Sequence, residues 1–586
     1  MQRFPAYLHG FAFAGHVGEI SARTPEEVRP AFEELQRQLA AGLHAAGFVC
    51  YEAAGAINDT LTTAPAHPMP LLWFGLFTTR RPKTFPQHEA PFRCTDWQIS
   101  PGWESYRDSV QEIRDFIAAG DSYQVNYTIR QRFAFSGCSR SFFSALCGNQ
   151  PTPYNCYLEC GRWRVLSASP ELFFSLSGDR LVTRPMKGTA PRGRWYAEDL
   201  ARKEQLRQSP KEVAENLMIV DLLRNDMGMV SQTGSVQVDS LFDVESHPTV
   251  HQMTSTIQSR VEEGVTPLEL FEALFPCGSV TGAPKRRSME IIAQLEREPR
   301  GLYTGCLGYF SPGGEAQFSV AIRTAVLDLQ TGRGEMGIGS GITYDSQPEA
   351  EYQECLDKRA FIEEQRPEFH LIESLLHDER GYFLLDRHQE RLKRSASYFS
   401  FPLADGAALR ALQETAADLI PSTGYKVRLL LFRDGRLSCE AAPLAEATPE
   451  AKVSFARQRV SSTDPFLYHK TSRRDLFHRE LAARPDLAEV IFENERGEVT
   501  EGAYSNLIAV IDGTKCTPPL DCGLLPGTLR EELLAQGTIE ERILKREDLE
   551  RAEAVFLVNS VRGWRQATLL DEETDAGKFP PPEGEG

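Results

Sequence analysis

The chain has 586 residues, of which 41% are hydrophobic and 25% charged, and its 64 Lys and Arg against 82 Asp and Glu give a formal net charge of −18. This composition excludes a disordered, collagen-like or disulfide-scaffold protein, and the negative charge disfavours binding to nucleic acid or to an anionic membrane. No apolar run approaches the ~20 residues of a membrane span, and the amino-terminal segment lacks the hydrophobic stretch of a secretory signal, so we expect a cytoplasmic protein. Twelve cysteines without a C-x-x-C pair favour free thiols over a zinc or redox site.

In the first half, aromatic and β-branched runs alternate with amphipathic segments. The spacing of apolar residues predicts helices at Tyr106–Ala119, Val213–Asn225 and Pro284–Glu296. The apolar runs predict strands at Trp163–Ser167, Glu171–Ser175 and Phe318–Val326. We therefore expect a mixed α+β domain with one or two large sheets over residues 1–364.

Acids spaced three apart, and so on one helical face, occur near the starts of two helices: Glu212 with Glu215, and Glu351 with Glu354. Before the first pair, Ser209 at the N-cap and Pro210 at the first helical position predict a capping box with Glu212. The helix dipole alone accounts for either pair. If the two helices face each other, the four acids would instead suit magnesium, which takes carboxylates, waters and substrate oxygens.

Two glycine-rich loops lie between these helices, at residues 276–285 and 337–341. The backbone N–H groups of the first loop, together with Thr281, suit a carboxylate or phosphate at the start of a helix. A glycine turn needs no ligand, so each loop is weak evidence by itself. Arg323 is stronger evidence, because the apolar pattern places it inside a strand, where a guanidinium needs an anion or an acid partner.

Motifs in this half follow one another in the order found in the chorismate-utilising enzymes, which the sequence resembles from about Trp103 to Lys358. They are SASPE at 167–171, PMKGT at 185–189, RND at 224–226, GSVTGAPK at 278–285, GYF at 308–310, AIRT at 321–324 and DSQP at 345–348. The resemblance implies a large two-sheet chorismate-binding fold.

Lys187 distinguishes two branches of that family. Anthranilate synthases are expected to carry alanine there, whereas aminodeoxychorismate synthase component I carries lysine. The resemblance implies that the neutral amine of Lys187 attacks C2 of chorismate while the C4 hydroxyl departs with the help of magnesium, and that ammonia then adds at C4 and expels the lysine. Burial or a neighbouring cation such as Arg184 must lower the pKa of Lys187, and Glu171 is the implied acid–base partner. A solvated surface lysine is the alternative.

The same resemblance implies magnesium ligands and substrate contacts. The magnesium ligands would be Glu212, Glu215, Glu351 and Glu354, with Glu215 and Glu354 bound directly. The contacts to chorismate would be Thr281, Tyr309, Arg323, Gly341, Lys358 and, near the ring, His251. The chain has no G-x-C-x-G nucleophile motif, so ammonia must come from solution or from a separate glutamine amidotransferase subunit.

A polar run with a proline at residues 363–368 predicts a boundary, with a linker at 365–370, a second domain at 371–578 and a disordered tail at 579–586. Apolar runs predict strands at Val427–Phe432, Val490–Phe492, Asn506–Ile511 and Ala554–Val558. Helical spacing predicts helices at Arg387–Ser397 and Leu529–Gln536. We expect a second α+β domain.

The second half resembles the fold-type IV, class IV aminotransferases. Its motifs are DRHQERL at 386–392, HKT at 469–471, TEGAYSN at 500–506, LPGTLREE at 525–532 and NSVRG at 559–563. The resemblance implies pyridoxal 5'-phosphate, with Lys470 bonded to it and later moving a proton, and Glu501 pairing with the pyridine nitrogen. Further cofactor contacts would be Arg391, Asn506, Thr528, Leu529 and Ser560. A tyrosine common after the lysine is replaced by Leu476-Phe477, which leaves the partner of the cofactor's phenolic oxygen open.

Together the two resemblances predict a two-step synthesis of 4-aminobenzoate, a folate precursor. The first half would make 4-amino-4-deoxychorismate, and the second would eliminate pyruvate from it. The alternatives are anthranilate synthase component I joined to a branched-chain or D-amino-acid aminotransferase, a fusion with an inactive second half, and a non-catalytic scaffold. A homodimer through the second domain is compatible with the resemblance.

Overall fold

The structure is a computed structural model that describes residues 6–65, 67–358, 368–420, 423–445 and 450–570. The chain forms two compact units, residues 1–191 with 203–366 and residues 192–202 with 367–586. The predicted linker at 365–370 lies partly outside the described residues, and the predicted tail at 579–586 lies wholly outside them. No helix within the described residues is long and apolar enough to cross a membrane.

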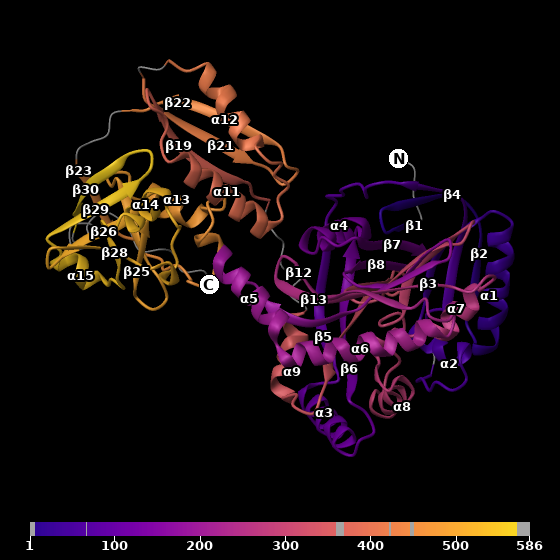
Figure 1. Cartoon of the computed structure of the whole chain (residues 1–586). Coiled ribbons are helices and arrows are strands. Elements are labelled where there is room, and N and C mark those ends of the chain that lie inside the picture. Colours follow the sequence, from indigo (N-terminus) through magenta and orange to yellow (C-terminus); the bar gives the residue numbers. More distant parts are fainter. Residues whose placement is uncertain (1–5, 66, 359–367, 421–422, 446–449, 571–586) are drawn as a thin grey trace. The chain divides into compact units, whose positions relative to one another are not determined.

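The first unit is built on eighteen hydrogen-bonded strands (Figure 1). Their pairings are antiparallel, and neighbours follow the order β5-β6-β18-β17-β8-β7-β1-β2-β4-β3-β15-β16-β9-β10-β13-β12, with β14 beside β6 and β11 beside β13. The bounds are β1 Ala6–Leu8, β2 Phe11–Ala22, β3 His44–Val49, β4 Leu72–Pro82, β5 Phe92–Ser100, β6 Gln124–Gly137, β7 Tyr154–Cys160, β8 Trp163–Ser169, β9 Leu172–Ser177, β10 Arg180–Arg184, β11 Met186–Pro191, β12 Gln237–Ser246, β13 Val250–Arg260, β14 Gly282–Ala283, β15 Cys306–Ser311, β16 Glu315–Val320, β17 Thr324–Asp328 and β18 Arg333–Ile342.

Helices pack on these strands, as the α+β expectation requires. They are α1 Pro25–Ala40, α2 Ala54–Ile57, α3 Trp103–Ala118, α4 Ser139–Asn149, α6 Pro210–Gly228, α7 Pro267–Leu274, α8 Lys285–Leu295 and α9 Pro348–Asp357. A further helix, α5 Tyr196–Gln208, begins in the second unit and ends in the first. The three helices predicted in this half correspond to α3, α6 and α8, so those predictions are confirmed. One core cluster includes Phe32, Phe271 and Phe318, and another includes Tyr106 and Ile291.

The start of α6 follows the sequence signal in part. The Ser209 side chain accepts a hydrogen bond from the backbone N–H of Glu212, and Pro210 opens the helix. The reciprocal half of the capping box is replaced, because the Ser209 N–H donates to the Leu206 carbonyl at 3.2 Å. The Glu212 carboxylate is therefore released from capping. Since α6 packs on β11 and β13, and α9 on β18, the two acid-bearing helices lie against the strands of the predicted chorismate site.

The predicted single strand Phe318–Val326 is wrong, because the chain forms two strands there. β16 ends at Val320 and pairs with β15 and β9, whereas β17 begins at Thr324 and pairs with β8 and β18. The backbone turns between them, and Arg323 has a φ of 50°, in the left-handed region. An apolar run does not reveal that a strand changes partners.

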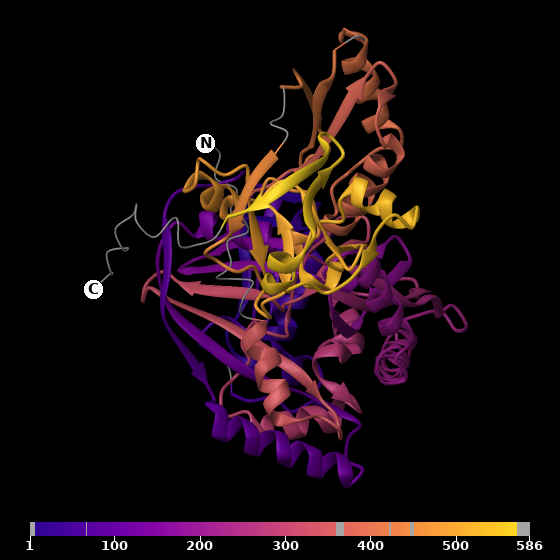
Figure 2. The same cartoon turned by 90° about the vertical axis from the view of Figure 1, so that its left-hand side faces the viewer.

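The second unit contains two sheets, coloured orange and yellow in Figure 2. One has the order β20-β19-β21-β22, with α11 packed on β19 and α12 on β22; the other has the order β25-β24-β23-β30-β29-β26-β27-β28. The strands of the second unit are β19 Leu371–Asp378, β20 Gly381–Tyr382, β21 Tyr425–Leu431, β22 Leu437–Pro443, β23 Glu450–Phe455, β24 Glu489–Glu493, β25 Val499–Gly502, β26 Asn506–Ile511, β27 Thr514–Thr517, β28 Glu540–Glu541, β29 Ala554–Asn559 and β30 Gly563–Leu569. Its helices are α11 Leu385–Phe399, α12 Ala407–Ala417, α13 Asp475–Ala482, α14 Thr528–Ala535 and α15 Arg546–Arg551. The strands and helices predicted for this half are confirmed.

The predicted first domain, residues 1–364, includes a segment that is not part of the first compact unit, which consists of residues 1–191 and 203–366. Residues 192–202 belong to the second unit, although they precede its main body by more than a hundred residues in sequence. The buried Arg192–Asp199 ion pair and the packing of Trp195 against Tyr468 hold them there. Sequence patterns report local periodicity, so they do not show that a short segment leaves one unit for another.

Candidate active sites

Lys187 lies in β11, between α6 and the glycine-rich strand β18. Asn216 of α6 donates a hydrogen bond to the Lys187 carbonyl at 3.2 Å. A methyl group built on Gly341 of β18 would lie 2.8 Å from Lys187 Nζ, so the missing side chain leaves room for the amine. Gly188 has a φ of 95°, and a Cβ there would lie 3.1 Å from Glu212 Oε2. The glycines therefore let the amine and α6 approach closely.

Glu171 is a buried carboxyl group whose charge interacts with that of Lys187. Its Oε1 accepts a hydrogen bond from Ser279 Oγ at 2.6 Å, in the glycine loop predicted to bind an anion. Burial raises the pKa of Glu171 to about 7, while the Ser279 hydroxyl and the charge of Lys187 oppose the rise. A carboxyl group that titrates near neutrality can both accept and donate a proton.

Burial also lowers the pKa of Lys187, and the charge of Lys358 lowers it further, while Glu215, Glu171 and Glu354 act in the opposite direction. Lys358, in the last turn of α9, donates a hydrogen bond to the Gly339 carbonyl of β18 at 3.0 Å. The cation near Lys187 is therefore Lys358. Arg184, the cation suggested from the sequence, forms an ion pair with Glu245.

The acids of α6 and α9 act on one another but do not form a four-residue cage. The pKa of Glu212 is raised by burial and by the charges of Glu215 and Glu354. Glu351 is engaged elsewhere, since Ser346 Oγ donates to its carboxylate at 2.7 Å. Lys211 and Lys358 lie 4.0 and 2.7 Å from the carboxylates of Glu215 and Glu354.

Within the described residues, no group of three or more His, Cys, Asp and Glu side chains is arranged to hold a metal ion. Magnesium, however, is usually bound by one or two carboxylates together with waters and substrate oxygens. The donor chemistry of Glu215 and Glu354, on two different helices, fits that requirement, and Glu212 and Glu351 stay predicted ligands.

Arg323 has the environment expected of an anion-binding residue. Burial lowers the pKa of its guanidinium to about 10, and none of the described residues forms an ion pair or hydrogen bond with it. His251 is buried in β13, with Nδ1 3.1 Å from Ser246 Oγ. Thr281 is also buried, but its hydroxyl donates to the Cys277 and Gly278 carbonyls, each at 3.2 Å, so it contributes to the shape of the loop.

Tyr309 does not line the Lys187 site. Its ring packs among Phe11 and Phe13, and the Arg80 guanidinium lies 4.9 Å from its centroid. A different aromatic residue, Tyr303, packs on the glycine-rich part of β18: a Cβ on Gly337 would lie 2.1 Å from its ring. Gly337 and Gly341 are four residues apart on β18 and so share a face, which places Tyr303 on the side of the strand that faces Lys187. No periodicity or motif marked Tyr303 in the sequence.

In the second unit, Lys470 provides a buried amine. Burial lowers its pKa to about 7, and the charges of Arg474 and Arg391 contribute. The Lys470 carbonyl accepts a hydrogen bond from Ile372 N–H at 2.9 Å, which ties the lysine to β19. A large share of this amine is therefore neutral at pH 7, as bond formation with an aldehyde requires.

Glu501 of β25 has one carboxylate oxygen occupied and one without a partner. Oε2 accepts hydrogen bonds from Asn506 Nδ2 at 3.3 Å and from Leu525 N–H at 3.2 Å. Oε1 is buried and has no hydrogen-bond partner within the described residues. Burial raises the pKa of Glu501 to about 7. A buried, unpaired carboxylate oxygen near a buried amine fits a protonated ring nitrogen, so the site fits pyridoxal phosphate.

Arg391 belongs to a buried network that the sequence analysis did not foresee. Its guanidinium donates to both oxygens of Glu373, at 2.9 and 2.7 Å, and to the Pro526 carbonyl at 3.2 Å. His388 Nδ1 lies 2.6 Å from Glu373 Oε2, and its Nε2 lies 3.2 Å from Thr528 Oγ1. These contacts fix Arg391 and Thr528 at the start of α14. Glu373 and His388 were missed because their partners are distant in sequence.

The remaining residues predicted to contact the cofactor, Leu529 and Ser560, also belong to the second unit. Leu529 is buried in a cluster with Ile508, so only its backbone is free to contact a ligand. Ser560 is buried at the end of β29, after Asn559, whose side-chain oxygen accepts hydrogen bonds from two backbone N–H groups. Phe477, at the position predicted to lack a tyrosine, packs against Phe492 with 4.4 Å between ring centroids.

Comparison with known proteins identifies both halves. Residues 3–364 match the family described as chorismate binding enzyme. The chain belongs to the chorismate binding enzyme family. Residues 370–570 match the family described as amino-transferase class IV, so the chain is a fusion of the two enzyme domains.

The relatives of the first half include proteins named for two different products. Aminodeoxychorismate synthase component 1 of Escherichia coli is 42% identical over 264 residues, 45% of this chain and 58% of that protein. Anthranilate synthase component 1 of Aquifex aeolicus is 39% identical over 266 residues, 45% of this chain and 53% of that protein. The solved anthranilate synthase component I from Streptococcus pneumoniae aligns with a TM-score of 0.54 and 25% identity over 62% of this chain and 93% of that chain. The chain thus spans about half the length of the relatives matched by sequence.

Proposed function

We propose that this chain makes 4-aminobenzoate from chorismate and ammonia in two steps, one in each unit. The first unit converts chorismate to 4-amino-4-deoxychorismate, and the second releases pyruvate from that product. The observation that carries the proposal is Lys187: an amine with a lowered pKa lies beside Gly341 and in the field of Glu171, a carboxyl group that titrates near pH 7.

In the first step, the neutral amine of Lys187 attacks C2 of chorismate, and the C4 hydroxyl leaves as water with a proton from Glu171. Ammonia then forms a bond at C4, the bond between C2 and Lys187 breaks, and Glu171 receives the excess proton. Arg323 supplies the unpaired cation that a substrate carboxylate needs. Magnesium at Glu215 and Glu354 would stabilise negative charge on the departing oxygen.

In the second step, Lys470 removes the proton from C4 of aminodeoxychorismate, and the ring becomes aromatic as pyruvate leaves. Pyridoxal phosphate, when bound, supplies the electron sink for this elimination. Glu501 would hold the ring nitrogen through its unpaired oxygen, while Arg391 and Thr528 would hold the phosphate at the start of α14. Glu373 and His388 orient those two residues.

Ammonia would come from a separate glutamine amidotransferase subunit, consistent with the component 1 naming of the relatives. A homodimer through the second unit stays a prediction. The rival proposal is anthranilate synthesis in the first unit, which the similarity to anthranilate synthases favours. Lys187 argues against it, because anthranilate synthases are expected to carry alanine at this position.

Product analysis tests the proposal. The purified protein is incubated with chorismate, magnesium, ammonium and pyridoxal phosphate, and the products are separated and quantified. We expect 4-aminobenzoate and pyruvate in equal amounts, and aminodeoxychorismate in place of 4-aminobenzoate from a Lys470→Ala variant. Anthranilate as the aromatic product, or transamination between an amino acid and a 2-oxo acid without 4-aminobenzoate, would refute it.

A further inference from the structure

Residues 192–202, here called the inserted segment, are the part of the first family match that belongs to the second unit. The segment follows β11, which carries Lys187, and includes the first residues of α5. Two sets of contacts hold it in the second unit. Each set reaches one of the two residues that precede Lys470, which is proposed to bind the cofactor.

The first set surrounds a buried ion pair. Arg192 donates to both carboxylate oxygens of Asp199, at 2.7 and 2.8 Å, and both side chains are only 7% exposed. Arg192 also donates to the Tyr398 carbonyl at 2.8 Å, and the Tyr398 hydroxyl donates to the Gly193 carbonyl at 2.7 Å. The ring of Tyr398 lies on that of His469, with 4.3 Å between centroids. His469 directly precedes Lys470.

The second set surrounds Tyr468, two residues before Lys470. Trp195 packs on the ring of Tyr468 with 5.1 Å between centroids, beside an apolar cluster that includes Phe477 and Phe492. The Tyr468 hydroxyl in turn donates to the Ser462 carbonyl at 2.7 Å. The side chain of Tyr468 is therefore held by Trp195 through its ring and by Ser462 through its hydroxyl.

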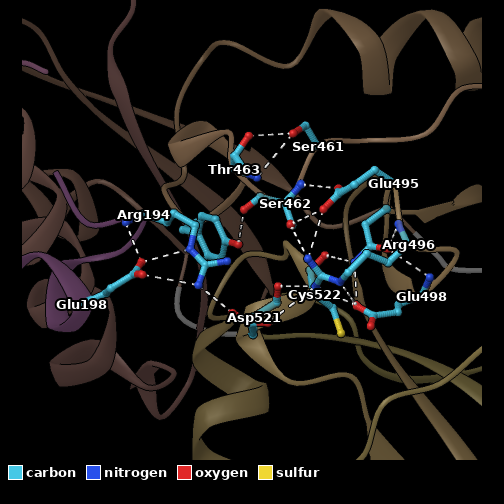
Figure 3. Close-up of polar contacts among 12 residues, drawn as sticks. Arg194, Glu198, Ser461, Ser462, Thr463, Glu495, Arg496, Glu498, Asp521 and Cys522 are labelled. Atoms are coloured by element: carbon cyan, nitrogen blue, oxygen red, sulfur yellow. Dashed lines mark hydrogen bonds and ion pairs between the residues drawn. The ribbon is translucent and has the colours of Figure 1, made fainter. Parts of the chain in front are cut away.

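Arg194 extends these contacts to the loop before α14 (Figure 3). It donates to Glu198 at 3.0 Å and to Asp521 at 2.6 Å. Arg496 approaches Asp521 from the other side, donating to its carbonyl at 2.9 Å and to Ser462 Oγ at 2.7 Å. Asp521 begins the loop that continues through Leu525, whose N–H binds Glu501, to Thr528.

The inserted segment thus contacts the chain just before Lys470 and just before the loop that reaches Glu501 and α14. We propose that it is a positioning element of the second active site, with Trp195 and the Arg192–Asp199 pair holding Lys470 and the cofactor-binding loop in place. The second active site is then completed by residues encoded within the first domain. A cofactor site needs such supporting contacts, because a small displacement of a reacting group weakens both binding and reaction.

Cofactor binding to the full-length chain tests this inference. The protein is stripped of cofactor and titrated with pyridoxal phosphate, and binding is followed by the visible absorbance that borohydride removes. We expect Trp195→Ala and Asp199→Asn to raise the dissociation constant by roughly tenfold or more, as loss of supporting contacts does at other cofactor and metal sites. Trp195→Phe retains a ring for Tyr468 and should restore most of the affinity.

The pH at which half of the protein carries cofactor attached to Lys470 is a second readout. A purely structural role of the segment would leave this pH unchanged. Loosened packing admits water to Lys470, so this midpoint should rise by about one pH unit in both variants. Arg207→Gln is the matched control. It removes an exposed pair with Glu204 in the same helix α5 but outside the segment, and it should leave both readouts unchanged.

Unchanged affinity and an unchanged midpoint in both variants would overturn the inference, even if the melting temperature fell. Asp199→Asn keeps the shape of its side chain, so the test stands if Trp195→Ala does not fold. The readout is attachment of the cofactor to Lys470. A failure here is therefore distinguishable from a failure of the proposed 4-aminobenzoate synthesis, which is judged by its products.

Discussion

Replacing Lys470 by methionine should stabilise the cofactor-free second unit near neutral pH. Burial holds the pKa of this amine at about 7, against an ordinary value of 10.5, so the folded protein must release a proton or carry a desolvated charge. Each pKa unit corresponds to about 1.4 kcal/mol, and the difference of 3.5 units (10.5 − 7) corresponds to ~5 kcal/mol. Methionine has a similar volume and no charge, so it removes that cost.

The sign of the pH dependence follows from proton binding. Between about pH 7 and 10.5 the unfolded chain holds a proton that the folded chain has lost, so the free energy of unfolding of the wild type rises with pH. The advantage of Lys470→Met should therefore be ~5 kcal/mol at and below pH 7, shrink to ~2 kcal/mol at about pH 9, and vanish above about pH 10.5.

Urea unfolding of the cofactor-free full-length chain at several pH values measures this advantage, with hydrogen exchange on peptides of β24 and β26 assigning it to the second unit. Lys393→Met makes the same chemical change at an exposed position of α11 and should show no such gain. A methionine variant that is no more stable than the wild type at pH 7, or whose advantage does not change with pH, would refute the assignment of Lys470 as a desolvated amine.

Four further substitutions probe the first unit. Lys187→Ala should abolish aminodeoxychorismate formation from ammonia while pyruvate release from supplied aminodeoxychorismate survives; wild-type synthesis by this variant, measured by chromatography, would exclude the covalent lysine. Glu215→Gln and Glu354→Gln should each lose magnesium-dependent turnover, and an unaltered magnesium titration in both would leave these acids as helix-terminal features. Gly341→Ala should slow synthesis by up to about a hundredfold, because its methyl group would lie 1.9 Å from Gln124 Nε2 and 2.8 Å from Lys187 Nζ; a rate within twofold of the wild type would show that both side chains have room to move.

Local signals in the sequence were sufficient for much of the secondary structure and for the family. Ser209 and Pro210 mark the start of α6 because capping and the fixed φ of proline act within one helical turn. The order of short motifs identifies both domains, because those residues meet substrate or cofactor and their spacing along the chain is visible directly. Lys187 and Lys470 were found in this way, and both are amines with lowered pKa values in the structure.

Contacts between distant parts of the chain decided the rest. The turn at Arg323, the pairing of Arg184 with Glu245 and the packing of Tyr309 away from Lys187 depend on strand partners that periodicity cannot reveal. The buried position of Glu373 beside Arg391 depends on a contact between β19 and α11. Residues 192–202 show the same limit. Arg192 and Trp195 contact residues more than two hundred positions further along the chain. Those residues form a surface only once the second unit has folded.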